Sequence, residues 1–188
     1  MDYVLQSLFS YAHLLFSLCA SFKEKIVIFK DGESLVLKFK IEELKLENLK
    51  EAIKVIEDTF LKFDAPDYSE EGIENFFKFA NYETIKENLS RNMKMYVAKV
   101  NEKIVGVIGY RDNSHINLLF VLEEYQHNGI AKTLYNLVIE KCKNVDTKKV
   151  TVNSSPYAHN VYLKLGFIDD NQMQEVDGIK FYPMHKEI

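Results

Sequence analysis

The chain has 188 residues, of which 47% are hydrophobic and 28% are charged. This length and composition fit one folded domain and exclude a disordered or collagen-like chain. The net charge of −4 provides no basic surface for nucleic acid, so we expect no nucleic-acid partner. Cys19 and Cys142 are too few and too far apart to form a zinc site. They predict reduced thiols in a cytoplasmic protein without a bound metal.

The N-terminal segment, residues 1–38, is predicted to be an extension outside the main domain. Residues 3–22 are largely apolar and predict an amphipathic or buried helix that packs on the body or on a second subunit. Gln6 and His13 interrupt the run, so we expect no membrane span, and contact with a membrane surface is the alternative. Asp31-Gly32 then separates two alternating runs, which predicts a β-hairpin. A homodimer is a possible consequence of the apolar helix face.

From Phe39 onward, strand and helix patterns alternate in one domain, residues 39–188. Apolar residues at helical spacing from Leu46 to Phe60 predict a first amphipathic helix, and Pro66 ends it. The further predicted elements are helices over 69–79 and 82–92, strands over 93–100, 103–111 and 115–122, a helix over 129–143, a strand over 149–153, a helix over 155–165 and a last strand from Gly178 to Pro183.

The passage after residue 121 carries the first candidate site. It reads EEYQHNGIAKTL and connects an apolar strand to a helix, where open α/β sheets bind ligands. Gly129 and the small Ala131 allow a ligand to approach the backbone, and the amides of a helix's first turn bind anions. The fragment is neither a GxGxxG nor a Walker loop. It predicts a phosphate site of another kind.

The same residues carry a resemblance to a known family. Residues 126–131, QHNGIA, resemble the Q/R-x-x-G-x-G/A signature of the GNAT family of acyl-CoA N-acyltransferases. LLFV precedes this segment like that family's fourth strand, and VTVNSSPYA follows like its fifth. Residues 158–167 resemble its A-x-x-x-Y-x-x-x-GF helix. The departures are Glu123, His127 and Ala131, where the family often has Pro, Gly and Gly.

This resemblance implies an α/β (α+β) fold with a mixed, mostly antiparallel sheet in which the fourth and fifth core strands splay apart. It also implies acetyl-CoA as the cofactor. The matching positions for its pantetheine arm are Leu119, Phe120 and Val121, with a backbone amide near Leu119 or Phe120 polarising the thioester. The matching positions for its diphosphate are Gln126, His127, Asn128, Gly129, Ile130, Ala131 and Lys132, and Asn153 could order the cofactor or water.

The resemblance also places candidate catalytic residues. Tyr162 matches the tyrosine that protonates the departing thiolate, and a core aromatic with a hydrogen-bonded hydroxyl is the alternative. His115 lies where some members carry a catalytic glutamate, so it is a candidate base, directly or through water. A hydrogen-bonded strand-end histidine is equally consistent with its position. The loop Asp64-Ala65-Pro66-Asp67-Tyr68 matches one that borders the acceptor pocket in the family, so Asp67 and Tyr68 are candidate contacts of the amine.

Together these features predict an N-acetyltransferase that moves an acetyl group from acetyl-CoA to a primary amine by direct attack in a ternary complex. The acceptor is expected to be a small molecule or a peptide. Two alternatives stay open. One is a catalytically silent acyl-CoA-binding module, and the other is a transferase of a longer acyl group.

Overall fold

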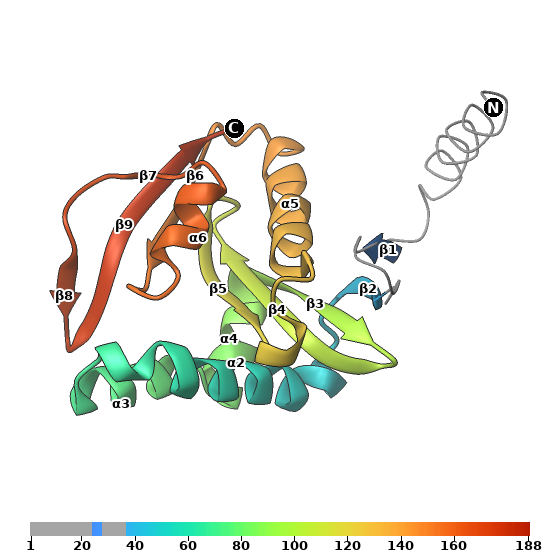
Figure 1. The fold of residues 1–188 in the computed structure, drawn as a ribbon, viewed down its shortest axis with the longest axis horizontal. Coiled ribbons are helices and arrows are strands. Elements are labelled where there is room, and N and C mark those ends of the chain that lie inside the picture. The colour runs from blue at the N-terminus through green and yellow to red at the C-terminus, as the bar shows by residue number, and fades with distance from the viewer. Residues whose placement is uncertain (1–23, 28–36) are drawn as a thin grey trace, which may run out of the picture.

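In the computed structural model, the described residues, 24–27 and 37–188, form a nine-stranded mixed sheet with helices on both faces (Figure 1). The strand order is β1-β2-β3-β4-β5-β6-β9-β7, and β8 pairs with β9 outside this path. The predicted helix over residues 3–22 and the hairpin turn at residues 30–33 lie outside the described residues. Among the helices that are described, none has the length and apolar character needed to cross a bilayer.

The first half of the sheet is antiparallel throughout. It consists of β1 (Glu24–Val27), β2 (Leu37–Glu43), β3 (Met93–Val100), β4 (Lys103–Arg111) and β5 (His115–Val121). Asn101 and Glu102 join β3 to β4 with φ values of 48° and 66°, the left-handed pair that a tight hairpin turn needs. β1 and β2 pair as the predicted hairpin requires. β2 runs without a break across the predicted boundary between residues 38 and 39, and that division stays a prediction.

The second half of the sheet joins the first through a parallel pair. It consists of β6 (Lys149–Ser154), β7 (Ile168–Asp169), β8 (Gln174–Val176) and β9 (Ile179–Glu187). β6 runs parallel to β5, and β9 pairs antiparallel with β6, β7 and β8. The mixed, mostly antiparallel sheet predicted from the sequence is therefore confirmed.

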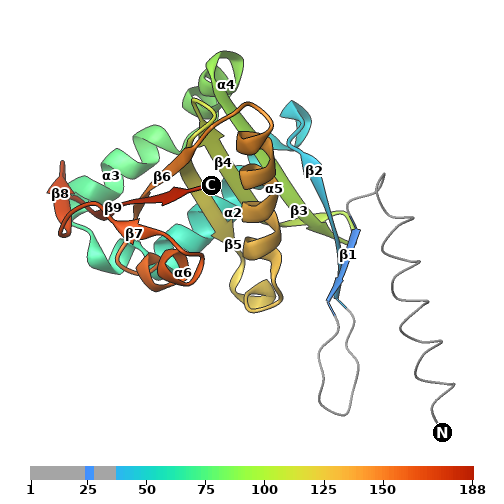
Figure 2. The same ribbon diagram turned by 90° about the horizontal axis from the view of Figure 1, so that it is seen from above.

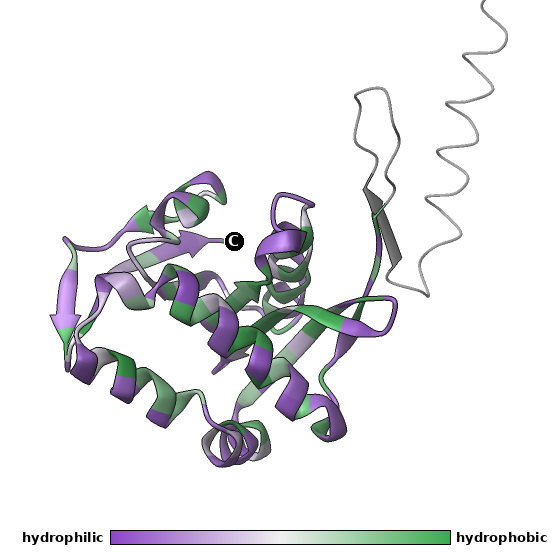
Figure 3. Cartoon of the chain, turned by 60° about the horizontal axis from the view of Figure 1, so that its bottom comes forward, coloured by the Kyte–Doolittle hydropathy of each residue, from purple (hydrophilic) through white to green (hydrophobic). Residues whose placement is uncertain are grey.

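Helices cover the sheet from two sides (Figure 2). The helices are α2 (Leu49–Phe63), α3 (Glu70–Phe79), α4 (Tyr82–Arg91), α5 (Ile130–Lys143) and α6 (His159–Lys164), with short 3₁₀ turns η1 (Leu46–Asn48), η2 (Ala65–Asp67) and η3 (Glu123–Tyr125). α2 and α4 pack on one face of β3–β5, and α5 packs on the other. Along α2 and α3, apolar and polar residues alternate, as expected for half-buried helices (Figure 3).

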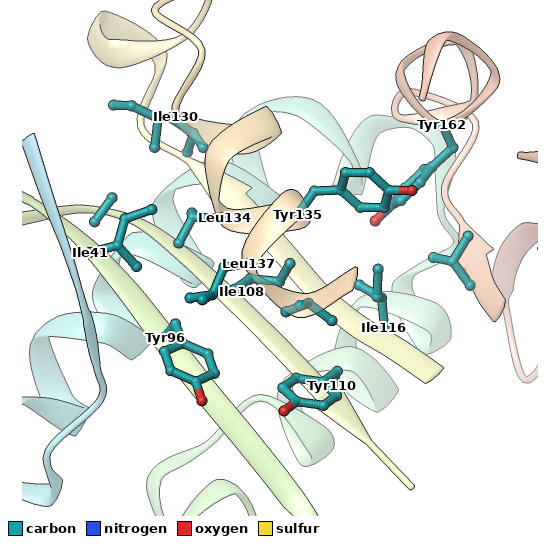
Figure 4. Packing of buried hydrophobic residues seen from close by; sticks show 14 of the residues in the cluster. Ile41, Tyr96, Ile108, Tyr110, Ile116, Ile130, Leu134, Tyr135, Leu137 and Tyr162 are labelled. Carbon is teal, nitrogen blue, oxygen red and sulfur yellow. The ribbon is translucent and has the colours of Figure 1, made fainter. Parts of the chain in front are cut away.

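The core consists of two clusters separated by the sheet. One lies under α5 and includes Leu134, Val138 and Cys142, which are fully buried (Figure 4). Cys142 is thus a small apolar packing residue. The other cluster lies under α2 and α4. β4 contributes to both clusters, and its seven central residues are all buried, which explains its unbroken apolar sequence.

Three predicted elements differ from the structure. The first helix begins at Leu49, and Leu46 lies in η1 with half of its surface exposed, so Leu46 is not part of the buried stripe. α6 begins only at His159, because residues 156–158 form a turn. β9 extends to Glu187, well beyond Pro183, because it pairs with β6 along that strand's whole length.

α3 is attached to the turn between β8 and β9. Gly178 has a φ of 76°, and a Cβ atom at Gly72 would lie 2.1 Å from the Gly178 carbonyl oxygen, so only a glycine fits at position 72. Ser69 caps α3 by accepting a hydrogen bond from the Gly72 amide at 3.1 Å. Asn75 donates to the Asp177 carbonyl at 3.0 Å. These contacts fix α3 beside the far end of the sheet.

Candidate functional site

β5 and β6 separate soon after they begin. Ladder pairs join them only at His115–Thr151 and Ile116–Val152, with one further bond from the Thr151 amide to the Ser114 carbonyl at 2.8 Å. The register of β5 against β4 then shifts, because Asn117 is an extra residue between two paired ones. Such a bulge bends a strand and increases its twist. We call the unpaired stretch, residues 117–121 of β5 opposite 153–154 of β6, the β5–β6 gap.

The backbone of β5 presents free hydrogen-bonding groups to this gap. The Leu122 amide donates to the Val105 carbonyl of β4 at 2.9 Å, and the bonding side alternates along an antiparallel strand. Leu119 and Val121 therefore direct their amides away from β4, toward the gap. The Phe120 amide faces β4. An extended chain that entered the gap could pair with β5 as an added strand.

The turn after β5 holds a row of free amides. In the part of the chain that is described, the amides of residues 127–132 donate to no acceptor, whereas the Thr133 amide donates to the Gly129 carbonyl at 2.9 Å. His127 and Gly129 have φ values of 61° and 75°, in the left-handed region. Where a left-handed residue lies beside a right-handed one, successive backbone amides point toward a common centre and form a concave anion site called a nest. Gly129 is also the residue that precedes α5, so the helix dipole adds to the attraction for an anion.

The Gln126 side chain connects this turn to β5 and to the loop that follows β6. Its Nε2 donates to the Val121 carbonyl at 3.0 Å, and its Oε1 accepts from the Tyr157 hydroxyl at 3.3 Å. Asn128 donates to the Gln126 carbonyl at 2.8 Å. The amide turn and the open edge of β5 are thereby held as one surface. The residues present fit a ligand that has a diphosphate at one end and an extended, amide-containing arm at the other.

Tyr162 lies on α6 with its ring edge-on to Phe167, at a centroid distance of 5.3 Å. The side chain is 4% exposed. Tyr135 contacts the same Phe167 ring, and Figure 4 shows both tyrosines between α5 and α6. Burial, and next the negative charge of Asp64, raise the pKa of Tyr162. Tyr162 therefore keeps its proton at neutral pH.

Asp64 is a residue that the sequence analysis did not single out. It follows the last residue of α2, and only 7% of its surface is exposed. Burial raises the pKa of its carboxyl to about 6, the nearby Ser155 hydroxyl offsets part of this rise, and the charge of Asp67 adds to it. Its negative charge acts on Tyr68 and on Tyr162. The family resemblance marks the loop of residues 64–68, but a carboxylate that directly follows an amphipathic helix has no periodicity to distinguish it within that loop.

The end of α2 is held against the loop after β6. The Phe63 and Tyr157 rings stack with centroids 4.7 Å apart and an interplanar angle of 18°. Asp64, the residue after Phe63, belongs to the same contact, because it lies close to Ser155, two residues before Tyr157. Tyr157 also reaches Gln126. Residues from both faces of the sheet thus meet beside the β5–β6 gap.

His115 lies at the opposite, paired end of β5. Its Nδ1 shares a hydrogen bond with the Thr151 hydroxyl at 2.8 Å. Burial, and then the positive charge of Arg111, lower the pKa of His115, and Asp112 acts the other way. At about 3.3 Å per residue, roughly 13 Å of strand separates it from Leu119. A proton could pass between His115 and the gap only through intervening groups or water.

The structure places the other predicted residues as follows. Tyr68 is half-buried with its ring edge-on to Phe60 at 5.6 Å, and Asp67 is exposed in η2, so both lie near Asp64. Asn153 lies on the part of β6 that borders the gap, with an exposed side chain. Lys132 lies in the first turn of α5 and is exposed.

The family model described as "Acetyltransferase (GNAT) domain" matches residues 64–188. The fold also resembles many solved structures. A GCN5-related N-acetyltransferase from Rhodopseudomonas palustris aligns with a TM-score of 0.71 at 18% identity, over 87% of this chain and 99% of the other. The PaiA N-acetyltransferase from Thermoplasma acidophilum, in complex with coenzyme A, aligns with a TM-score of 0.68 at 23% identity, over 80% and 99%.

A GNAT-family acetyltransferase from Staphylococcus aureus Mu50 aligns with a TM-score of 0.63 at 21% identity, over 79% of this chain and 98% of the other. None of the curated proteins matches the chain. At these identities the solved structures establish the fold, and the family model covers well over half of the chain. The splayed strands, the amide turn and the matched domain lead to one conclusion: this chain is a member of the GNAT family of acyltransferases.

Proposed function

We propose that the protein transfers an acetyl group from acetyl-CoA to a primary amine, by direct attack within a ternary complex. The observation that carries this proposal is the combination of the free amides of residues 127–132 with the unpaired edge of β5. The amides supply a site for the diphosphate, and the edge supplies a site for the pantetheine arm. The thioester then supplies an activated acyl group at the end of that arm.

In this proposal the donor is held mostly by backbone groups. The amides of residues 126–132 surround the diphosphate, with Lys132 as an added positive charge. The Gln126 amide already donates to the Glu123 carbonyl, so residues 127–132 carry most of the binding. Leu119 and Val121 pair with the arm, while Asn153 borders it from β6. Of the two amides expected to polarise the thioester carbonyl, the orientation of β5 favours Leu119 over Phe120.

Tyr162 is the proposed acid. The side chain is almost completely buried, the hydroxyl stays protonated, and we propose that it donates to the leaving sulfur. A raised pKa makes it a weaker acid than a thiol, so it can give up its proton only as it receives one from the acceptor nitrogen. Asp67 and Tyr68 are the proposed contacts of the acceptor amine, since they lie near Asp64 and Tyr162 rather than near the diphosphate site.

His115 stays a candidate base that acts through water. The structure supports this role less than the sequence suggested, because the Thr151 hydroxyl already engages its Nδ1 and the strand carries it away from the gap. A second base candidate is developed below.

The test is coenzyme A release from acetyl-CoA, measured with panels of polyamines, amino acids, aminoglycosides and peptide N-termini. We expect at least one amine to give turnover, and Tyr162→Phe to slow it by about 10²-fold or more with coenzyme A affinity unchanged. Tight binding of acetyl-CoA without turnover of any amine would instead favour a silent binding module. Turnover only with longer acyl-CoA donors would favour the other alternative.

A further inference from the structure

Asp64 is a nearly buried carboxylate that serves no evident structural purpose. It occupies the N-cap position of η2, but its side chain makes no capping hydrogen bond. Within residues 37–188, no Lys, Arg or His forms an ion pair with it. Lys62, two residues away, pairs with Glu123 instead. Buried charges in proteins are normally paired, so a partner of positive charge is missing here.

The position of Asp64 indicates what that partner is. The stack of Phe63 on Tyr157 holds Asp64 against the loop that follows β6, at the end of the β5–β6 gap. Its charge acts on Tyr162, which comes from the other side of the sheet, and on Tyr68. The groups that face it are therefore Ser155, Tyr162, Tyr68 and Asp67, and none of them is cationic.

We infer that Asp64 binds the ammonium group of the acceptor and removes its proton before attack. This inference rests on the proposed acetyltransferase function and adds a catalytic base to it. The ammonium ion would provide the missing positive partner. Proton transfer to Asp64 would leave a neutral amine and a neutral buried acid, which is the form that burial favours.

The proton and bond changes balance as follows. The acceptor, R–NH₃⁺, gives one proton to the Asp64 carboxylate and becomes R–NH₂. Its nitrogen bonds to the thioester carbon, and the C–S bond breaks with its electron pair on sulfur. The nitrogen's second proton replaces the one that Tyr162 gives to the thiolate. The products are the N-acetyl amine and free coenzyme A, and Asp64 releases its proton to water.

The experiment compares Asp64→Asn with the wild type over pH 5 to 8.5, using an amine found in the panel screen. The wild type is expected to lose kcat/KM below about pH 6, where the carboxyl becomes protonated in the absence of substrate. In Asp64→Asn we expect kcat to fall by about 10²-fold or more. The decrease in kcat/KM at low pH, which we call the acidic limb of the pH profile, should disappear. The dissociation constant of coenzyme A should change by less than about twofold, because the donor site is separate.

Asp58→Asn is the matched control. Asp58 is exposed on the same helix and pairs with Lys54, so the variant removes the same charge without touching the gap. Its rate and pH profile should match those of the wild type. His115→Ala is the competing variant, since a histidine of lowered pKa would produce a similar acidic limb. If His115→Ala retains the acidic limb, the result supports Asp64 as the base.

Three results would overturn the inference. Asp64→Asn could keep the rate and the acidic limb, or the limb could vanish in His115→Ala instead. Asp64→Glu, which keeps a carboxylate, could be no more active than Asp64→Asn although its circular dichroism shows a folded protein. If the wild type binds coenzyme A but acetylates no amine, the proposed function itself is wrong and the inference is withdrawn with it. Turnover by the wild type together with any of the first three results removes only the role of Asp64.

Discussion

At the scale of single residues, Asp64 shows how a functional group can cost stability. A carboxylate buried without a cation is unfavourable, and the protein relieves this by holding a proton to a higher pH than usual. Natural proteins retain such groups chiefly where chemistry needs them, so the cost itself is an argument for function. The effect on stability can be measured without any substrate.

We predict that Asp64→Asn is more stable than the wild type at neutral pH. The folded-state pKa of about 6 exceeds the unfolded value of ~3.9, so the native state binds more protons between these values. Wild-type stability therefore falls as the pH rises through this window, whereas the variant does not share the loss. The difference should be near zero below pH 4 and reach up to about 3 kcal/mol above pH 6. Urea unfolding at pH 4 and pH 7.5 measures it. Equal or lower stability of the variant at pH 7.5 would contradict the assignment of a costly buried charge.

The same scale shows what sequence could and could not predict. Tyr162, Gly129 and Gln126 were selected as candidates because their spacing resembles a family pattern. Asp64 lies in a loop that the same resemblance marks, but it was not selected, because its proposed role depends on α2 and the loop after β6 coming together, more than 90 positions apart in the chain. His115 was chosen by spacing, but the hydrogen bond to Thr151 depends on strand pairing that no local pattern reveals.

At the scale of elements, the turn from β5 to α5 is the proposed link between the fold and cofactor binding. A helix start with left-handed residues at 127 and 129 exposes amides that an ordinary helix cap would satisfy. The strands and helices around this turn followed the predicted periodicities closely, because each has a strong apolar pattern. β7 and β8 were missed, since they are two and three residues long and exposed throughout, with no alternation of buried and exposed residues to detect.

We predict that Gly129→Val abolishes coenzyme A binding, with a rise of about 100-fold or more in the dissociation constant. The φ of 75° at Gly129 is unfavourable for a β-branched residue, and the added side chain would stand where the diphosphate approaches the amides. Isothermal titration with coenzyme A measures the change. Thr133→Val is a control on the same helix, because its hydroxyl only donates back to the Gly129 carbonyl. Affinity that survives in Gly129→Val would contradict the diphosphate site.

At the scale of the whole molecule, the parting of β5 and β6 makes one site from two faces of a sheet. The proposed donor-binding groups lie along β5 and the start of α5, while Asp64 follows α2 and Tyr162 lies on α6 (Figure 1). The bulge at Asn117 and the short parallel ladder are both consequences of pairing, so composition and periodicity could not predict this opening. Only the family resemblance predicted the separation of these two strands. The roles of residues 1–38 and of a homodimer stay predictions.

The central claim is that the edge of β5 binds the pantetheine arm, and amide hydrogen exchange measured by NMR tests it most directly. In the free protein the amides of Leu119 and Val121 should exchange quickly, while that of Phe120, which faces β4, is protected. Saturating coenzyme A should slow exchange at Leu119 and Val121 by about tenfold or more and leave Phe120 nearly unchanged. Coenzyme A that binds without any added protection at these two amides would contradict the account.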